Sequence, residues 1–503
     1  MPRLTARELL DLVIDPGSWD SWDTTPRRAG IGAAYAAELD AAAAKAGTDE
    51  SVLTGSALIE GRRVAVLISE FGFLAGSIGR DAADRLVAAI TRATAEGLPL
   101  MGAPASGGTR MQEGTPAFVQ MVRIGEALLR HKAAGLPYLV YLRHPTTGGV
   151  MATWGSLGHI TVAEPRALLG FLGPKVVELV TGQPLPADVQ QAESLSSHGI
   201  IDGIVLPSDV REVLSATLGL VCDQVTAVPA PGSAGATAAE GAEGTGDGAG
   251  EETEQPDAWT AITATRDPAR PGIRELLGQA EAVVPLSGTT RGERDSGISL
   301  ALARFGGVAC VVVAQDRTAQ AKRPFGPSGL RTAQRGIALA ESLGLPLMTV
   351  IDTPGAELSG KAESGGIAGE IARTLAALVE VRTPTLTLML GQGNGGGALA
   401  LFPADRIIAA RNAWLTPLPP EGASVIVYGD TSHAPAMAEA QHVRAGDLAD
   451  LGVVDRILPE HPDAAAEPEA FLARVATAVA EELAGLLVAG PGTTTERAGR
   501  FTR

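Results

Sequence analysis

The sequence TLTLMLGQGNGGGALAL at residues 385–401 joins a run of leucine and β-branched residues to a cluster of glycines. Such a run is typical of a buried strand, and the glycines after it are typical of a tight turn that opens a helix. The same order occurs at residues 136–153, where LPYLVYLRHPTTGGVMAT places Gly148 and Gly149 after another apolar run. Both stretches predict a unit of strand, glycine turn and helix.

The two halves of the chain repeat this order with the same spacing. An earlier glycine turn stands roughly 40 residues before each cluster, ASGG at residues 105–108 and DTPG at residues 352–355. A further apolar run follows each cluster, IDGIVLP at 201–207 and VVDRILPE at 453–460. The repeated motif order, spacing and strand pattern predict an internal duplication.

Around the glycine turns, short β-branched runs alternate with amphipathic or Ala-rich runs, which is typical of an α/β fold. In the run 115–133, the apolar residues follow helical spacing: Phe118, Met121, Val122, Gly125, Leu128 and Leu129. The expected strands are residues 63–69, 136–142, 309–314, 346–351 and 385–390, and the expected helices are residues 81–94, 115–133, 330–343 and 367–381.

One segment interrupts this pattern. Residues 227–256 consist of small residues, prolines and acids with no periodic apolar positions. Such a segment buries too little surface to offset its ordering entropy, so we expect a flexible acidic linker. The sequence therefore predicts a first domain at residues 1–226 and a second at residues 257–503.

Composition and charge exclude several classes of protein. With 45% hydrophobic residues the 503-residue chain has ample material for a core, and 40 Lys and Arg against 57 Asp and Glu give a net charge of −17. That balance argues against nucleic-acid binding, which needs a positive surface. The apolar N-terminal stretch contains Glu8 and Asp11, so it does not resemble a signal peptide, and no apolar run approaches the length of a membrane span. We expect a cytoplasmic protein.

The glycine turns predict a particular chemistry. A glycine lets the backbone approach a ligand, and a helix N-terminus presents free N–H groups. Two such turns on adjacent strands place two N–H groups around one oxygen, which is the arrangement of an oxyanion hole. A duplicated fold then supplies two holes for two carbonyl centres, although each turn taken alone is equally consistent with a tight βα connection.

Two other glycine motifs are weaker. Residues 355–362 fit the spacing of a P-loop, but Ala362 stands where a magnesium-binding hydroxyl is required. Residues 391–396 fit a dinucleotide-binding pattern, yet the next expected strand, 406–410, ends in Arg411 and Asn412 rather than an acid for the ribose. We expect neither a P-loop nor a dinucleotide site.

Side-chain catalysts and metal ligands are poorly represented. The sequence has no G-x-S-x-G elbow and no paired histidine spacing, and its two cysteines, Cys222 and Cys310, suit small buried positions better than a metal site. His144 is positioned to reach a ligand or to cap a turn, and Glu113 to complement a helix dipole. The sequence thus predicts no metal and a site built mainly from backbone amides.

Several stretches resemble known proteins. ASGGTRMQEG at residues 105–114 closely resembles the β subunit of the acetyl-CoA carboxylase carboxyltransferase, and the second half is similar to the α subunit, in the fused β–α order. Further matching stretches in the first half are residues 76–86, 144–174 and 200–205, and those in the second half are residues 325–335, 351–360, 391–401 and 419–424.

The resemblance implies two tandem crotonase-like ββα-spiral domains of the ClpP/crotonase type. It implies carboxyl transfer from carboxybiotin, held on a separate carrier protein, to the α-carbon of an acyl-CoA, giving malonyl-CoA from acetyl-CoA. Partners would be the biotin carboxyl carrier protein and biotin carboxylase, and the active site would lie between two protomers of a homodimer or larger oligomer. No dedicated protein base is required, because the biotin nitrogen takes the α-proton.

Residue roles follow from the same resemblance. The first-half hole would hold the thioester oxygen, and the second-half hole the ureido oxygen of biotin. The amides assigned to these holes are Gly107, Gly108, Gly148 and Gly149 in the first half, and Gly355, Gly396, Gly397 and Ala398 in the second. The CoA phosphates would meet Arg80, Arg110 and Lys175.

The chain also departs from the family pattern. It lacks the four-cysteine zinc ribbon that bacterial β subunits usually carry, so no metal is carried over. Gln392, Asn394 and Ala400 near the second hole leave the acyl preference open. Two alternatives remain at this point, a malonyl-thioester decarboxylase subunit of the same fold and a non-catalytic scaffold subunit of a carboxylase complex.

Overall fold

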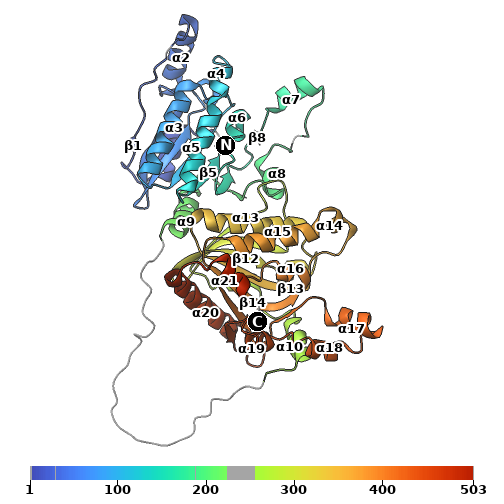
Figure 1. The fold of residues 1–503 in the computed structure, drawn as a ribbon. Coiled ribbons are helices and arrows are strands. Elements are labelled where there is room, and N and C mark those ends of the chain that lie inside the picture. Colours follow the sequence, from blue (N-terminus) through green and yellow to red (C-terminus); the bar gives the residue numbers. More distant parts are fainter. Residues whose placement is uncertain (1–2, 29, 187, 224–254, 502–503) are drawn as a thin grey trace, which may run out of the picture.

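The computed structural model describes residues 3–28, 30–186, 188–223 and 255–501. Two mixed sheets, one in each half of the chain, are stacked one above the other along the long axis of the molecule (Figure 1). The predicted linker, residues 227–256, lies outside the described residues except for Gln255 and Pro256.

The first sheet has seven strands, in which an antiparallel group β1-β2-β3 is followed by the parallel strands β4, β5, β7 and β9. Its strands are β1 (Asp20–Ser21), β2 (Val52–Ile59), β3 (Arg62–Ser69), β4 (Leu100–Ala103), β5 (Tyr138–Leu142), β7 (Ile160–Ala163) and β9 (Gly203–Ile204), and a separate two-stranded sheet joins β6 (Thr146–Thr147) to β8 (Leu169–Gly170).

The second sheet has eight strands and repeats the same plan, with antiparallel β10-β11-β12 followed by parallel β13, β14, β15 and β17, while β16 extends the end of β14. Its strands are β10 (Ala282–Leu286), β11 (Ile298–Phe305), β12 (Val308–Gln315), β13 (Leu347–Thr353), β14 (Thr385–Asn394), β15 (Arg406–Ala410), β16 (Trp414–Thr416) and β17 (Arg456–Leu458). The shared plan confirms the predicted α/β class and the internal duplication.

Both halves also contain helices. The first half contains α1 (Ala6–Val13), α2 (Ala33–Ala46), α3 (Arg80–Ala95), α4 (Thr115–Phe118), α5 (Gln120–Ala133), α6 (Gly148–Met151), α7 (Pro174–Thr181), α8 (Ala192–Ser197) and α9 (Val210–Cys222). The second contains α10 (Ala258–Thr265), α11 (Ile273–Leu277), α12 (Arg317–Gln320), α13 (Pro327–Leu343), α14 (Gly360–Ser364), α15 (Ile367–Glu380), α16 (Gly395–Leu399), α17 (Pro420–Tyr428), α18 (Ala434–Ala440), α19 (Ala445–Asp450), α20 (Pro468–Ala489) and α21 (Thr494–Gly499).

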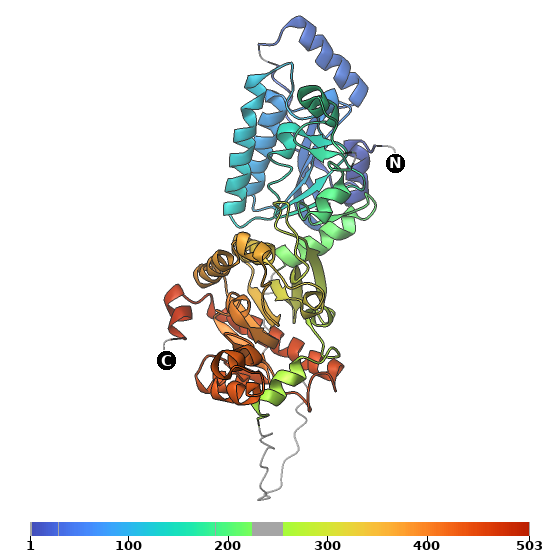
Figure 2. The same ribbon diagram turned by 90° about the vertical axis from the view of Figure 1, so that its right-hand side faces the viewer.

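The central strands are buried on both faces, as expected when helices cover a parallel sheet. Every residue of β12, β13 and β14 is buried. The pair α3 and α5 packs side by side in the first half, and α13 and α15 form the equivalent pair in the second, at the junction between the halves (Figures 1 and 2).

Helix α9 links the two halves. The predicted boundary places it in the first domain, but it packs against β2 as well as β10, β11 and β12. Its Leu214 and Leu218 belong to a buried cluster that includes Val66 of the first sheet and Val311 of the second. The two sheets therefore share one continuous apolar core.

Two smaller observations complete the fold. Cys310 is buried in β12, whereas Cys222 is exposed at the end of α9, so the prediction of a buried side chain was wrong for Cys222. Along the described ranges, no helix has both the length and the apolarity that crossing a membrane requires.

Candidate active site

The two glycine turns of the first half lie in contact at the carboxyl ends of neighbouring strands. Thr147 N donates a hydrogen bond of 2.9 Å to Ser106 O, which joins the turn after β4 to the turn before α6. A Cβ on Gly148, whose φ is +65°, would lie 2.9 Å from the Cα atom of Gly108. Because a Cβ does not tolerate that approach, glycine is required where the two backbones meet.

Most of the predicted amide N–H groups in the first half already donate hydrogen bonds within the protein. Gly107 N donates to Ala75 O at 2.9 Å, Gly108 N to Ser106 Oγ at 2.9 Å, and Gly148 N to Phe171 O at 2.7 Å. Gly149 N and Thr109 N, by contrast, have no acceptor among the described residues. These two N–H groups are the available donors, and the sequence analysis named only Gly149.

The second half repeats this contact. Gly355 has φ +127°, and a Cβ there would lie 3.0 Å from Asn394 Nδ2, which donates a 2.6 Å hydrogen bond to Pro354 O. A Cβ on Gly397 would lie 2.6 Å from Phe325 Cζ and 3.4 Å from Ala356 N. The turn after β13 and the start of α16 are therefore packed directly against each other.

The second half likewise contains both hydrogen-bonded and available N–H groups. Gly355 N donates to Thr353 Oγ1 at 3.0 Å, whereas Ala356 N, Gly396 N and Gly397 N have no acceptor within the described part of the chain. Ala398 follows them in α16 with a fully buried side chain. The residue that sequence reasoning missed, Ala356, directly follows the glycine, just as Thr109 follows Gly108.

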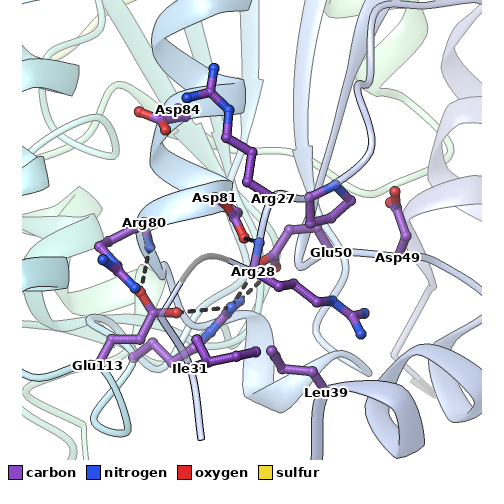
Figure 3. Close-up of a pocket in the computed structure, with 12 residues that line it drawn as sticks. Arg27, Arg28, Ile31, Leu39, Asp49, Glu50, Arg80, Asp81, Asp84 and Glu113 are labelled. Carbon is purple, nitrogen blue, oxygen red and sulfur yellow. Dashed lines mark hydrogen bonds and ion pairs between the residues drawn. The ribbon is translucent and has the colours of Figure 1, made fainter. Parts of the chain in front are cut away.

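A small cavity of about 160 Å³ lies beside the first turn, at the N-terminus of α3 (Figure 3). Its lining is nearly balanced in charge. The four arginines are Arg27, Arg28, Arg80 and Arg110, and the five carboxylates are Asp49, Glu50, Asp81, Asp84 and Glu113. A lining with more carboxylates than guanidinium groups does not by itself attract a phosphate.

The three basic residues predicted to meet CoA phosphates have different surroundings. Arg110 is 1% exposed, and its guanidinium bonds both carboxylate oxygens of Glu50 at 2.6 Å. Because this pairing uses its donors in the interior, the geometry argues against Arg110 as a phosphate contact. Arg80 is half exposed and lies 3.4 Å from Glu113 Oε2. Lys175 is exposed on α7, a helix with no buried residue.

His144 and Glu113 have structural roles. His144 Nδ1 accepts a 3.1 Å hydrogen bond from Leu168 N, so the side chain fixes a turn, and burial lowers its pKa. Glu113 Oε2 accepts a 2.7 Å hydrogen bond from Arg80 N, the first residue of α3. A carboxylate in that place complements the helix dipole, as the sequence predicted.

Side-chain chemistry at the turns is sparse. Across the ranges that the structure describes, no group of three His, Cys, Asp or Glu side chains is arranged to hold a metal ion. In the second pair of turns, Gly397 packs closely against Ala356, because a Cβ on Gly397 would lie 3.4 Å from Ala356 N. The arrangement can bind two carbonyl oxygens through main-chain donors and favour the negative charge that develops on them.

Comparison with known proteins identifies the family of the chain. The family model described as "Carboxyl transferase domain" matches residues 1–488. A probable biotin-dependent acyl-coenzyme A carboxylase beta3 subunit of Mycobacterium tuberculosis is 52% identical over 491 residues, which is 97% of this chain and 95% of that protein. The beta/alpha carboxyl transferase subunits of the acetyl-coenzyme A carboxylase of Salinispora arenicola are 35% identical, over 96% of this chain and 88% of that protein.

Solved structures show the same fold. The transcarboxylase 12S hexamer with methylmalonyl-coenzyme A and methylmalonic acid bound has a TM-score of 0.76 at 20% identity, covering 98% of this chain and 90% of that chain. A single-chain, multi-domain long-chain acyl-CoA carboxylase has a TM-score of 0.68 at 18% identity, covering 95% of this chain and 46% of that chain. The predicted pair of crotonase-like domains is therefore confirmed. This chain belongs to the carboxyl transferase domain family, the family of the biotin-dependent acyl-CoA carboxylase subunits to which it is similar, and is a transferase of that class.

Proposed function

We propose that this chain transfers a carboxyl group from carboxybiotin, held on a separate carrier protein, to the α-carbon of acetyl-CoA, giving malonyl-CoA. The first pair of turns binds the thioester oxygen through Gly149 N and Thr109 N, and the second binds the ureido oxygen through Ala356 N, Gly396 N and Gly397 N. The observation that carries the proposal is that these N–H groups, at two pairs of touching turns, have no acceptor among the residues that the structure describes.

The chemical role of these donors follows from the charge that develops. Carboxybiotin supplies the carboxyl group and, once that group has left, the base for the α-proton. The chain's own N–H groups stabilise the enolate oxygen at one turn and the urea oxygen at the other. Fixed main-chain donors of this kind are worth about 3 kcal/mol each in transition-state stabilisation.

For CoA recognition we retain two of the three predicted residues. Arg80 is half exposed beside the first turn, and Lys175 is exposed on α7. The loop before α7 contacts the turn before α6 directly, because Phe171 O accepts the hydrogen bond from Gly148 N. Both cations therefore lie on elements that adjoin the proposed thioester site.

The same proposal includes a homodimer or larger oligomer in which the first half of one protomer faces the second half of another. Large apolar side chains are exposed in both halves, including Leu179 of α7, 85% exposed, and Leu358 after Gly355, 94% exposed. Apolar surface of this kind marks an interaction site. The hexamer of transcarboxylase 12S supports this assembly.

Further parts of the proposal concern organisation and partners. We place the domains at residues 1–226 and 257–503 with a linker at 227–256, and the protein in the cytoplasm. The carrier and biotin carboxylase are proposed as separate proteins, supported by the name of the M. tuberculosis relative as a carboxylase subunit.

The experiment is an assay of the reverse reaction. The purified chain is incubated with malonyl-CoA and free biotin or biotinylated carrier, and the formation of carboxybiotin and acetyl-CoA is followed. Carboxyl transfer is expected. Loss of CO2 without biotin would identify a decarboxylase instead, and inertness with intact CoA binding would identify a scaffold. Transfer from methylmalonyl-CoA at a higher kcat/KM than from malonyl-CoA would overturn acetyl-CoA as the substrate.

A further inference from the structure

A buried ionic cluster lies directly behind the first glycine turn. Arg110 follows Thr109, one of the two available donors, and besides Glu50 its guanidinium bonds Ser51 Oγ at 3.1 Å and Ser77 O at 2.8 Å. Within this cluster, the Arg110 and Glu50 side chains are 1% and 3% exposed. The charges are thus removed from solvent immediately next to the proposed thioester site.

Glu113 extends the cluster to a helix at the surface. Besides Arg80 N, it accepts a 2.8 Å hydrogen bond from the hydroxyl of Tyr35 and lies 3.5 Å from Arg110 Nη1. Tyr35 belongs to α2, a helix that projects from the end of the molecule (Figure 2). Leu39 and Ala42 of α2 form a small buried apolar cluster with Phe73. Glu113 therefore connects α2, the start of α3 and the turn.

The backbone of the turn is joined to the neighbouring loop at three successive points. Gly107 N donates to Ala75 O, Ile78 N to Gly108 O, and Arg110 N to Ile78 O, at 2.9, 2.9 and 3.0 Å. Ala75 has φ +54°, a left-handed conformation that costs energy in a non-glycine residue. The surrounding bonds hold this loop, and the loop in turn holds Thr109.

The ionic cluster also packs closely against Gly79. A Cβ on Gly79 would lie 2.2 Å from Glu113 Oε1 and 2.7 Å from Arg110 Nη1. The φ of Gly79 is −93°, which any residue adopts, so only this contact requires glycine there. Gly79 is thus a position where one methyl group displaces the cluster and little else.

Stability alone is a weak reason for such a cluster, because well-packed apolar residues commonly replace a buried ion pair without loss. We propose that Arg110, Glu50, Glu113 and Tyr35 are positioning residues that hold the Thr109 N–H group where, together with the Gly149 N–H group, it polarises a thioester carbonyl. This inference rests on the proposed function, because it assigns the thioester oxygen to the first turn. It also gives Arg110 a role different from the phosphate contact that the sequence predicted.

The test uses the carbonyl of the bound substrate as its probe. Acetyl-CoA labelled with ¹³C at the thioester carbonyl is bound to the full-length protein, and its chemical shift is compared with that of free acetyl-CoA. The wild type should show a downfield shift, which Gly79→Ala should largely remove while kcat falls about tenfold or more. Gly125→Ala is the matched control, because the space beside Gly125 in α5 is open.

A second, milder variant keeps the test decisive if Gly79→Ala does not fold. Tyr35→Phe removes one hydroxyl and should reduce the carbonyl shift and kcat by a smaller factor, whereas Tyr141→Phe, which loses a hydrogen bond to Val205 O, should leave both unchanged. If folded Gly79→Ala and Tyr35→Phe proteins keep the wild-type shift, the inference is overturned while the proposed function stands. If the wild type transfers the carboxyl group but shows no shift, the inference is overturned and the proposed function stands, whereas a wild type that transfers no carboxyl group overturns the proposed function.

Discussion

Gly108 and Gly148 make room for each other's backbone, whereas the available N–H groups belong to their neighbours Thr109 and Gly149. In the second half, likewise, Gly355 N is hydrogen-bonded and the available N–H group belongs to Ala356. At Gly108, Gly148 and Gly355 the N–H group of the positive-φ glycine is itself hydrogen-bonded, and the next residue carries the available donor. The glycine motif thus indicates the location of the proposed hole and not the identity of every donor.

Gly397 both packs too closely to allow a Cβ and carries an available N–H group. Its substitution is therefore the most direct test of the proposed second hole. Gly397→Ala places a Cβ 2.6 Å from Phe325 Cζ and 3.4 Å from Ala356 N. We expect turnover to fall about 10²- to 10³-fold, as for the loss of one oxyanion donor, while the protein remains folded. Carboxyl transfer from malonyl-CoA to biotin measures the effect.

The control for Gly397→Ala is Gly360→Ala. Gly360 lies after the turn that contains Gly355, at the start of α14, and a Cβ there meets open space. We expect turnover within about twofold of the wild type. Equal losses in the two variants would show that the effect is not specific to the hole.

His159 predicts a pH dependence of stability. Burial lowers its pKa to about 3, and neighbouring Lys132 adds to this effect. Between pH 6.5 and 3 the imidazole is protonated in the unfolded chain but not in the native state. The free energy of unfolding therefore falls as the pH falls. From pH 7 to pH 5, His159→Gln should lose about 2 kcal/mol less free energy of unfolding than the wild type does.

Urea denaturation at pH 7 and at pH 5 measures this difference. Because His198 is exposed, His198→Gln should keep the wild-type pH dependence. An unchanged pH dependence in His159→Gln would contradict the assignment of the effect to the buried imidazole.

Long-range pairing explains what sequence reasoning missed at this scale. Arg110 follows the glycine turn, so it was expected at the ligand, but Glu50, its partner, lies 60 residues away in sequence. No local pattern reveals that pairing. Similarly, nothing in the HPTTGG motif shows that Phe171 O engages Gly148 N.

At the scale of elements, the predicted strands and helices are confirmed because their apolar periodicity is strong. The expected helix 115–133 is present but divides at Val119 into α4 and α5. Of its apolar residues Met121 and Leu128 are buried, whereas Phe118, Val122 and Leu129 are exposed. Periodicity indicates an apolar face, but it does not show whether the same chain covers that face.

The exposed side chains of α7 allow a test of its place in an interface. None of its side chains is buried, so Leu179→Glu should leave the fold intact but weaken an interface that covers this face. We expect a lower mass by light scattering at micromolar concentration and a parallel loss of turnover. Val488→Glu, at a 78% exposed position near the end of α20, is the control and should keep the wild-type mass. An unchanged mass for Leu179→Glu would exclude α7 from the interface.

At the scale of the whole molecule, α9 joins both sheets to one apolar core, so the two halves of one chain have a fixed relation. Within a chain the first pair of turns belongs to the first sheet and the second pair to the second sheet. The duplication was predictable from the repeated motifs, because each half carries its own strand and glycine pattern. The junction was not, because its residues have no local signature.

Assembly in trans makes a quantitative prediction for mixed oligomers. Gly149→Val disables the first hole and Gly397→Val the second, so each homodimer is inactive. In a mixed dimer with sites between protomers, one site combines two damaged holes and the other combines two intact ones. Random mixing of the two variants should therefore restore about a quarter of wild-type activity per protomer, since half of the dimers are mixed and each has one working site. Co-refolding at equal concentrations followed by the malonyl-CoA and biotin assay measures this, with each variant refolded alone as the control. If both holes of a site came from the same chain, mixing would restore nothing.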